Sequence, residues 1–420
     1  MKKTTAMKMA AGFLTVCVAL NVLALDPEIS NVVVRQRWPW SRLVNIDFVL
    51  ACEATQRVDV AVTAYDGGTP LPLPSDSLSG DLYGVSNGAR RIVWNPSKTV
   101  YTDTILPRFG VTLAPTAPYL VVDLVTGQFT RQFAFDAADD AYRTAKLVLR
   151  RIPAGTFSMG SPTNEFSRYT LDAREAQHQV TLTKDFYMGV FEVTQAQWGY
   201  LMGDRPSWFT NSLYWETRPV DQVAYTNIRG SVAGLNWPAT NTVDSASFIG
   251  QLRSKTGVNS FDLPTEAQWE YACRAGRSGS LNDGTANLDG SSTDTHLALL
   301  GRYRFNGGYI NDSTGPSNTC TTANGTAKAG SYVVNAWGLY DMHGNVWEWC
   351  LDRFTASLGS GPAEDPPGGA TGSNRTLRGG AFASYANQCR SAYRLGTYAQ
   401  TSIDKSFGFR LAIHDVTETE

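Results

Sequence analysis

The chain has 420 residues, enough for about two or three domains with cores of their own. Its formal net charge is −2 and only 18% of its residues are charged. This composition excludes a basic field of the kind that holds nucleic acid or an anionic membrane surface.

The N-terminus has the pattern of a secretory signal. A short lysine-containing region precedes an uncharged apolar run over 9–24, which ends in Val22-Leu23-Ala24. The run is short for a membrane span, and no second run of spanning length follows. We therefore expect residues 1–24 to be removed, leaving a secreted or periplasmic protein that begins at Leu25 and has no membrane span.

The segment over 27–115 has the pattern of a small all-β domain. Apolar and polar residues alternate, β-branched residues are frequent, and Asp-Gly, Asn-Gly and Pro-Ser turns separate the runs. These features favour an antiparallel sandwich. A linker is expected over 116–145, with a strand-like stretch over 119–123. Strands of the sandwich are expected over 31–38, 43–50, 57–64, 90–94 and 108–113.

A different pattern begins near Lys146 and continues to His414. One of its motifs predicts a helix, because Thr265 followed by Gln268 forms a capping box. Trp269 and Ala272 then share one helical face, which suits burial. The distinctive stretches occupy 152–161, 187–198, 218–223, 263–272, 338–349, 378–380 and 408–410.

In this order, the stretches resemble the formylglycine-generating-enzyme (sulfatase-modifying factor) family. The resemblance covers about two thirds of the chain. It implies an α+β domain over 146–414 with a C-type-lectin-like fold that is poor in regular structure and held together by its loops. The small sandwich would precede this domain.

The resemblance also implies a structural calcium at Gly338-Leu-Tyr-Asp-Met-His-Gly-Asn-Val-Trp-Glu-Trp349. Side-chain oxygens of Asp341 and Glu348 would bind it, together with main-chain carbonyls near Gly344 and Val346. Hard oxygen donors around a tight turn suit this ion. The alternative is a turn Asp and a core Glu that hold no metal. If calcium binds, the two carboxylates should point at one another.

The copper site of the family is not intact. Copper-dependent members carry a Ser after a Gly-Gly pair and then two cysteines, whose thiolates bind copper(I). Counting from Gly380 places Ala381 at the serine, Ser384 at the first cysteine and Cys389 at the second. Counting backward from the later Gly-Phe-Arg motif places Cys389 a few residues beyond the second cysteine. Either way at most one thiolate ligand remains, so copper is not expected.

The cysteines of the expected mature chain are odd in number. The resemblance implies a disulfide between Cys350 and Cys389. It leaves Cys273 unpaired, because the usual partner position is Ser391. No Cys-x-x-Cys motif occurs and the four histidines are scattered, so no zinc or three-histidine iron site is visible. The five cysteines are Cys52, Cys273, Cys320, Cys350 and Cys389, and two of them, Cys52 and Cys320, stay unassigned.

Three functions follow from these features. The first is a recognition or scaffold module, calcium-stabilised and lectin-like, that binds a protein or glycan outside the cytoplasm. The second is a formylglycine-generating oxidase acting on a sulfatase cysteine, with Cys389 as its remaining catalytic residue. The third is an iron-dependent sulfoxide synthase, which would need a histidine-rich domain that the sequence does not show. Copper content would separate the first two, and bound iron would favour the third.

Overall fold

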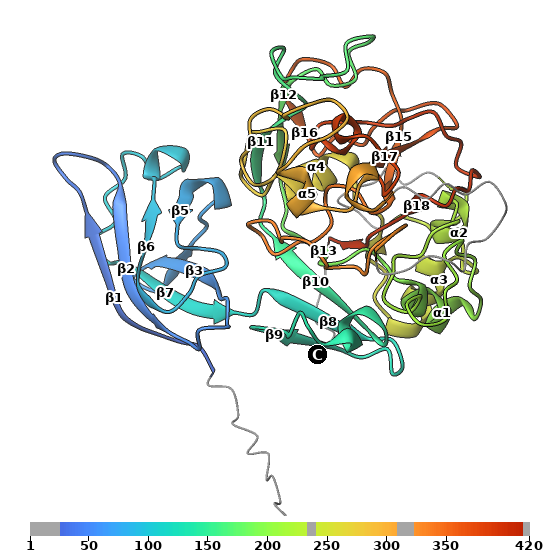
Figure 1. Cartoon of the computed structure of the whole chain (residues 1–420). Coiled ribbons are helices and arrows are strands. Elements are labelled where there is room, and N and C mark those ends of the chain that lie inside the picture. The colour runs from blue at the N-terminus through green and yellow to red at the C-terminus, as the bar shows by residue number, and fades with distance from the viewer. Residues whose placement is uncertain (1–25, 233–240, 309–322, 415–420) are drawn as a thin grey trace, which may run out of the picture.

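The computed structural model describes residues 26–232, 241–308 and 323–414. Figure 1 shows a β unit at the N-terminal side and a larger unit that contains all the labelled helices. The expected signal over 1–24 and Cys320 lie outside the described residues. Within the described part of the chain, no helix is both long enough and apolar enough to cross a membrane.

The N-terminal unit is built from two antiparallel sheets around one core. Along β2 every second side chain is buried, from Val44 through Ile46 and Phe48 to Leu50, which is the alternation that the sequence predicts. β1 starts earlier than predicted, and a bulge near Asn31 (φ 53°) shifts the register of its pairing with β2. The first sheet has the order β1 (Glu28–Gln36), β2 (Val44–Ala51), β6 (Gly88–Trp94), β5 (Leu78–Gly80). The second has the order β4 (Thr69–Leu71), β3 (Asp59–Asp66), β7 (Phe109–Thr116).

The larger unit contains a six-stranded sheet and two small three-stranded sheets. The large sheet has the order β14 (Phe261–Asp262), β19 (Ala412–Ile413), β13 (Phe186–Gly189), β10 (Lys146–Ile152), β8 (Tyr119–Asp123), β9 (Phe129–Gln132). The small sheets are β11 (Gly155–Met159), β12 (His178–Leu182), β16 (Ala363–Glu364) and β17 (Arg375–Arg378), β15 (Trp347–Arg353), β18 (Phe407–Gly408). The α-helices are α1 (Gln195–Met202), α2 (Tyr225–Arg229), α3 (Phe248–Thr256), α4 (Glu266–Arg274) and α5 (Leu297–Leu300).

Most of the stretch predicted as a linker, 116–145, is built into the larger unit. Its strand β8 pairs antiparallel with β10, with Asp123 opposite Lys146, and β9 extends the sheet beyond β8. The strand-like pattern over 119–123 therefore reflects a buried sheet strand, not a spacer. The C-terminal strand β19 pairs with β13 in the same sheet, so both ends of the unit are fixed to one scaffold.

Helix α4 begins with the predicted capping box. The Thr265 hydroxyl accepts a hydrogen bond from the Gln268 amide at 3.1 Å, and the Gln268 side chain accepts one from the Thr265 amide at 2.8 Å. Trp269 and Ala272 are fully buried, as their shared face predicts. The prediction did not foresee that the polar residues of α4 are buried too, including Glu266 and Glu270.

The two units share a buried ion pair. Arg150 on β10 makes a fork-like contact with Asp59 on β3, with both N–O distances at 3.1 Å. The Gly84 amide also donates to Asp59, at 2.8 Å. Because both charged groups are buried, this contact fixes the junction between the units through paired charges.

Candidate functional site

The segment after β17 folds back tightly on itself. Gly379 and Gly380 both have positive φ, of 92° and 78°. A Cβ atom at Gly380 would lie 2.4 Å from the Cys389 sulfur, so only glycine allows this approach. The short helix η5 (Ala386–Cys389) completes the fold-back and places Cys389 beneath the surface.

The structure brings together Ala381, Ser384 and Cys389, the three residues that the sequence resemblance assigns to the family's copper site. The Ser384 hydroxyl accepts a hydrogen bond from the Ala381 amide at 3.0 Å. Burial raises the pKa of the Cys389 thiol to about 12, against the opposing effect of a hydrogen bond from the same amide. Ser384 and Cys389 therefore meet at one backbone N–H, but only one of them carries sulfur. That sulfur is a neutral thiol at neutral pH.

Apolar side chains enclose Cys389. Its cluster also contains Leu281, Leu288, Leu297, Leu300, Tyr303 and Ala386. The buried His343 contacts its carbonyl through Nδ1 at 2.7 Å, while the Asn282 amide donates to Nε2 at 3.1 Å. This arrangement fixes the neutral Nδ1–H tautomer, and burial lowers the pKa of His343 to about 4. The histidine therefore has a packing role.

A groove of about 340 Å³ lies on the surface beside η5. Its two walls come from distant parts of the chain and are rich in tyrosine. Leu171 and Tyr385 are exposed there. No sequence pattern marks the first wall as functional, and our sequence analysis missed it. The groove is lined by residues 167–171 on one side and by Tyr385, Asn387, Gln388 and Tyr393 on the other.

Buried ion pairs fix the two walls to each other. Arg390, directly after Cys389, contacts Glu175 at 2.8 Å and Glu165 at 2.7 Å. All three side chains are at most 1% exposed. Burial raises the pKa of Glu165 in spite of Arg390. Since Glu165 and Glu175 flank the loop that forms the first wall, Arg390 holds this loop against η5.

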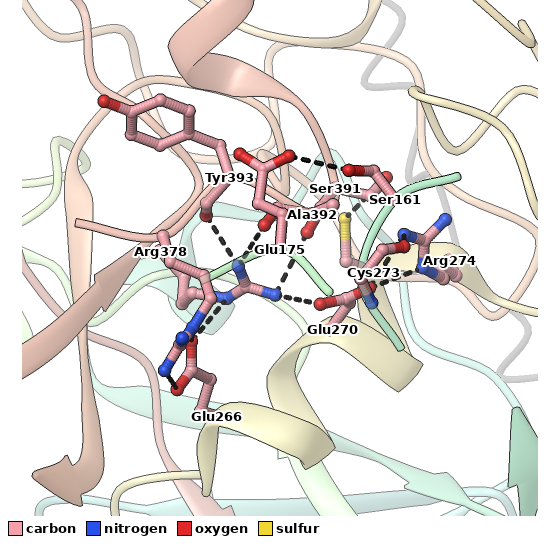
Figure 2. A network of polar contacts seen from close by, with 12 residues as sticks. Ser161, Glu175, Glu266, Glu270, Cys273, Arg274, Arg378, Ser391, Ala392 and Tyr393 are labelled. Atoms are coloured by element: carbon pink, nitrogen blue, oxygen red, sulfur yellow. Dashed lines mark hydrogen bonds and ion pairs between the residues drawn. The ribbon is translucent and has the colours of Figure 1, made fainter. Parts of the chain in front are cut away.

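A second charged network lies beneath this segment, as Figure 2 shows around Arg378. Arg378 forms an ion pair with Glu270 and donates to the main-chain carbonyls of Tyr393 (2.6 Å), Ala392 (3.0 Å) and Ser391 (3.1 Å). Burial pushes the pKa of Glu270 up, but Arg274 and Arg378 outweigh it and hold the pKa below the ordinary value. Arg378 therefore ties helix α4 to the segment that forms the site.

The motif that implies calcium forms the predicted turn, with Gly344 at φ 105°. Its two carboxylates take different partners. Both Glu348 oxygens contact Arg410 at 2.6 Å, and one of them also accepts from the Trp269 indole at 2.7 Å. Asp341 accepts from the Gly330 amide through Oδ2 at 2.5 Å. Its other oxygen, Oδ1, is buried without a hydrogen-bond partner among the described residues.

Asp341 lies near two other buried carboxyl groups, Glu192 and Glu348, and near the guanidinium groups of Arg143 and Arg410. Burial, opposed by the Gly330 hydrogen bond and by Arg410, raises the pKa of Asp341 to about 6. Burial, followed by repulsion from Asp341 and Glu348, raises the pKa of Glu192 well above its ordinary value. Glu192 accepts from Asn345 (2.5 Å) and from the Val346 amide (3.2 Å) and was missed by the sequence analysis. The unpartnered, buried Oδ1 of Asp341 is the feature that fits a cation at this position.

No group of three or more His, Cys, Asp or Glu side chains is arranged to hold a metal ion within the described ranges. Any cation at Asp341 would therefore depend on main-chain oxygens as well, such as those near Gly344 and Val346. Of the two side chains that the family resemblance implies as ligands, Asp341 has an unpartnered oxygen, whereas both oxygens of Glu348 contact Arg410.

The predicted disulfide between Cys350 and Cys389 is not formed, and both residues are free, buried thiols. Cys350 lies on β15 in a core cluster with Trp269 and Met342, whereas Cys389 belongs to the separate cluster beneath η5. Burial raises the pKa of Cys350 well above its ordinary value. The pairing is wrong because the two sulfurs pack in different cores.

The structure places Cys273 beside Ser391, as the motif positions suggest. Cys273 is a free, buried thiol whose sulfur lies 3.7 Å from the Ser391 hydroxyl and 3.8 Å from His343 Nε2. Burial raises the pKa of Cys273 to about 12. Cys52, on the N-terminal unit, is also a free thiol and is half-buried.

The chain is similar to known proteins over its larger unit. The model of the family described as "Sulfatase-modifying factor enzyme 1-like domain" matches residues 136–415. The formylglycine-generating enzyme of Mus musculus is 29% identical over 291 residues, covering 62% of this chain and 73% of that protein. The chaperone protein LppX of Paenibacillus barcinonensis is 34% identical over 191 residues, covering 41% of this chain and 64% of that protein.

Solved structures with a similar arrangement include Treponema denticola variable protein 1. That structure has a TM-score of 0.46 and 27% identity, and the match covers 64% of this chain and 96% of that one. PvdO from Pseudomonas aeruginosa has the same TM-score with 23% identity, over 64% of this chain and 94% of that one.

Proposed function

Because the chain belongs to the sulfatase-modifying factor family, we propose that it is an exported, non-catalytic member that acts as a lectin-like recognition module. The family match covers two thirds of the 420 residues. The observation that carries the proposal is the Ala381 amide, where a serine hydroxyl and one buried, neutral thiol meet. A copper(I) dithiolate needs two sulfurs at this place.

The groove beside η5 supports a binding role. Exposed aromatic and aliphatic side chains line it, and buried Arg390 holds its walls in place. Rigid aromatic side chains provide contact area at a low cost in conformational entropy. One similar protein is named a chaperone, which supports a protein as the occupant of this groove.

Copper binding tests the proposal directly. We expect the mature wild-type protein to compete poorly for copper(I) against a chromophoric chelator, because Ser384 offers no thiolate. The Ser384→Cys variant places a second sulfur at the Ala381 amide, beside Cys389, and should gain copper(I) affinity by at least about tenfold. Titration of the copper(I)–chelator complex followed by absorbance measures both proteins.

A matched variant isolates the role of Cys389 in this experiment. The double variant Ser384→Cys, Cys389→Ala should lose the gained affinity, because one sulfur remains. Tight copper(I) binding by the wild-type protein that disappears in Cys389→Ala would contradict the proposal.

Calcium at Asp341 is part of the same proposal. A raised carboxyl pKa means that ionised Asp341 destabilises the fold above about pH 6, and this penalty is relieved as pH falls toward 3.8. A cation that binds the ionised carboxylate removes the penalty at neutral pH. We therefore expect calcium to raise Tm at pH 7.5 much more than at pH 5.

The Asp341→Asn variant provides the control for calcium. It keeps an acceptor for the Gly330 amide but removes the charge, so its Tm should not respond to calcium at pH 7.5. Differential scanning calorimetry with and without saturating calcium measures the effect. An unchanged wild-type Tm at pH 7.5 would exclude calcium at this position.

A further inference from the structure

A second cavity, of about 550 Å³, lies at one end of the N-terminal sandwich. It is surrounded by the hairpin between β1 and β2, the end of β6 and the loop before β7. Phe109, the first residue of β7, lines the cavity. The last residues of β7 lead into β8 of the larger unit. The cavity is therefore at the end of the sandwich away from that unit, and its volume is in the range of small-ligand pockets.

Aromatic rings form much of the cavity. Trp94 stacks on Phe109 with ring centroids 4.9 Å apart and meets Tyr101 edge-on at 6.4 Å. Trp38, on the hairpin, lines the mouth and is 68% exposed, and Trp40 on the same hairpin is 91% exposed. Two exposed tryptophans on one hairpin of a small domain favour a binding surface, because an indole ring buries a large apolar area when a ligand covers it.

The lining of the cavity also contains polar side chains, among them one positive and one negative charge. Arg42 from the hairpin and Asp103 from the opposite loop form an ion pair at 2.8 Å, and both line the cavity. The indole N–H of Trp94 is buried and has no hydrogen-bond partner within the described ranges. The remaining polar lining residues are Gln36, Thr102 and Thr104. The lining thus offers donors and acceptors with a balanced charge.

This chemistry selects among ligand classes. An anionic ligand would require excess positive charge, which the Arg42–Asp103 pair does not supply. An acyl chain would leave the polar side chains without partners. A pyranose ring has an apolar face of C–H groups that covers an aromatic ring, and a rim of hydroxyls that each donate and accept. We propose that this cavity binds a short neutral saccharide, with Trp38 covering the sugar face and Arg42 and Asp103 bonding its hydroxyls.

Binding to an array of neutral and charged oligosaccharides tests this proposal on the whole mature chain. We expect binding to neutral glycans, confirmed by calorimetric titration with the best oligosaccharide of the array. Trp38→Ala should weaken that binding at least about tenfold, as the loss of one stacking ring does at sites that stack nucleic-acid bases. Arg42→Gln, which keeps a donor but breaks the ion pair, should weaken it less.

Two matched controls separate this site from other surfaces. Val100 is exposed on the same unit but does not line the cavity, so Val100→Ala should bind normally. Leu171→Ala alters the groove of the larger unit and should also leave saccharide binding unchanged, which distinguishes this site from the proposed recognition groove. Absence of neutral glycan binding, retention of it in Trp38→Ala, or binding of charged glycans alone would overturn the proposal.

Discussion

Replacing Arg378 with methionine should lower the free energy of unfolding by about 3–5 kcal/mol, the cost of breaking a buried ion pair from one side. Arg378 is fully buried, and its guanidinium contacts Glu270 and three consecutive carbonyls of the site segment. Methionine fills a similar volume, but the Glu270 carboxylate then has one cationic partner fewer. The three carbonyls that Arg378 bonds in the site segment also lose this donor. Urea unfolding followed by circular dichroism measures the loss.

The pH dependence of this loss identifies its cause. The lowered pKa of Glu270 contributes stability above the ordinary value of 4.5 and is lost as pH falls below it. The difference between wild type and Arg378→Met should therefore be largest near neutral pH and shrink in acid. Arg277→Met, at an exposed position, serves as the control and should change little. An Arg378→Met variant as stable as wild type would contradict the role given to the network.

The Ser391→Cys variant should form a disulfide with Cys273. The Cys273 sulfur and the Ser391 hydroxyl oxygen are 3.7 Å apart, and both residues are fully buried. The bridge would join positions 118 residues apart. In the chain-entropy model such a loop stabilises the fold by about 4–5 kcal/mol, reduced by any strain in the native state. The oxidised variant should therefore unfold at higher denaturant concentration than its reduced form.

Thiol titration of the denatured protein verifies the bond. The oxidised variant should show one free thiol fewer than the wild-type protein, because the bond takes up both Cys273 and the added cysteine. Ser391→Ala should show no difference between oxidising and reducing conditions, because it adds no sulfur. An oxidised Ser391→Cys protein with both thiols free would show that the two side chains do not reach each other.

Local sequence signals predicted the local structure well. The alternation along β2 and the capping box of α4 depend on residues within one strand or one turn, and both are confirmed. The family motifs located the site segment and identified Ala381 and Ser384 as its unusual residues. Each of these signals needs only neighbours along the chain.

Partners that come from distant segments could not be predicted in this way. Arg390 meets Glu175 across 215 residues, and Arg410 meets Glu348 across 62. The Cys350–Cys389 pairing failed for the same reason, since which core each thiol enters depends on how the loops close. The groove beside η5 likewise has walls from two remote segments, which the contacts of Arg390 with Glu165 and Glu175 hold together. Long-range charge pairing therefore decides the site more than any local motif.

One measurement tests the absence of catalysis most directly. The mature chain, reconstituted with copper(I), is incubated in air with a peptide that carries a sulfatase-type cysteine motif, and the peptide is analysed by mass spectrometry. With one buried thiol at the Ala381 amide, we expect the peptide cysteine to stay unconverted. Conversion of that cysteine to the aldehyde, abolished by Cys389→Ala, would contradict it.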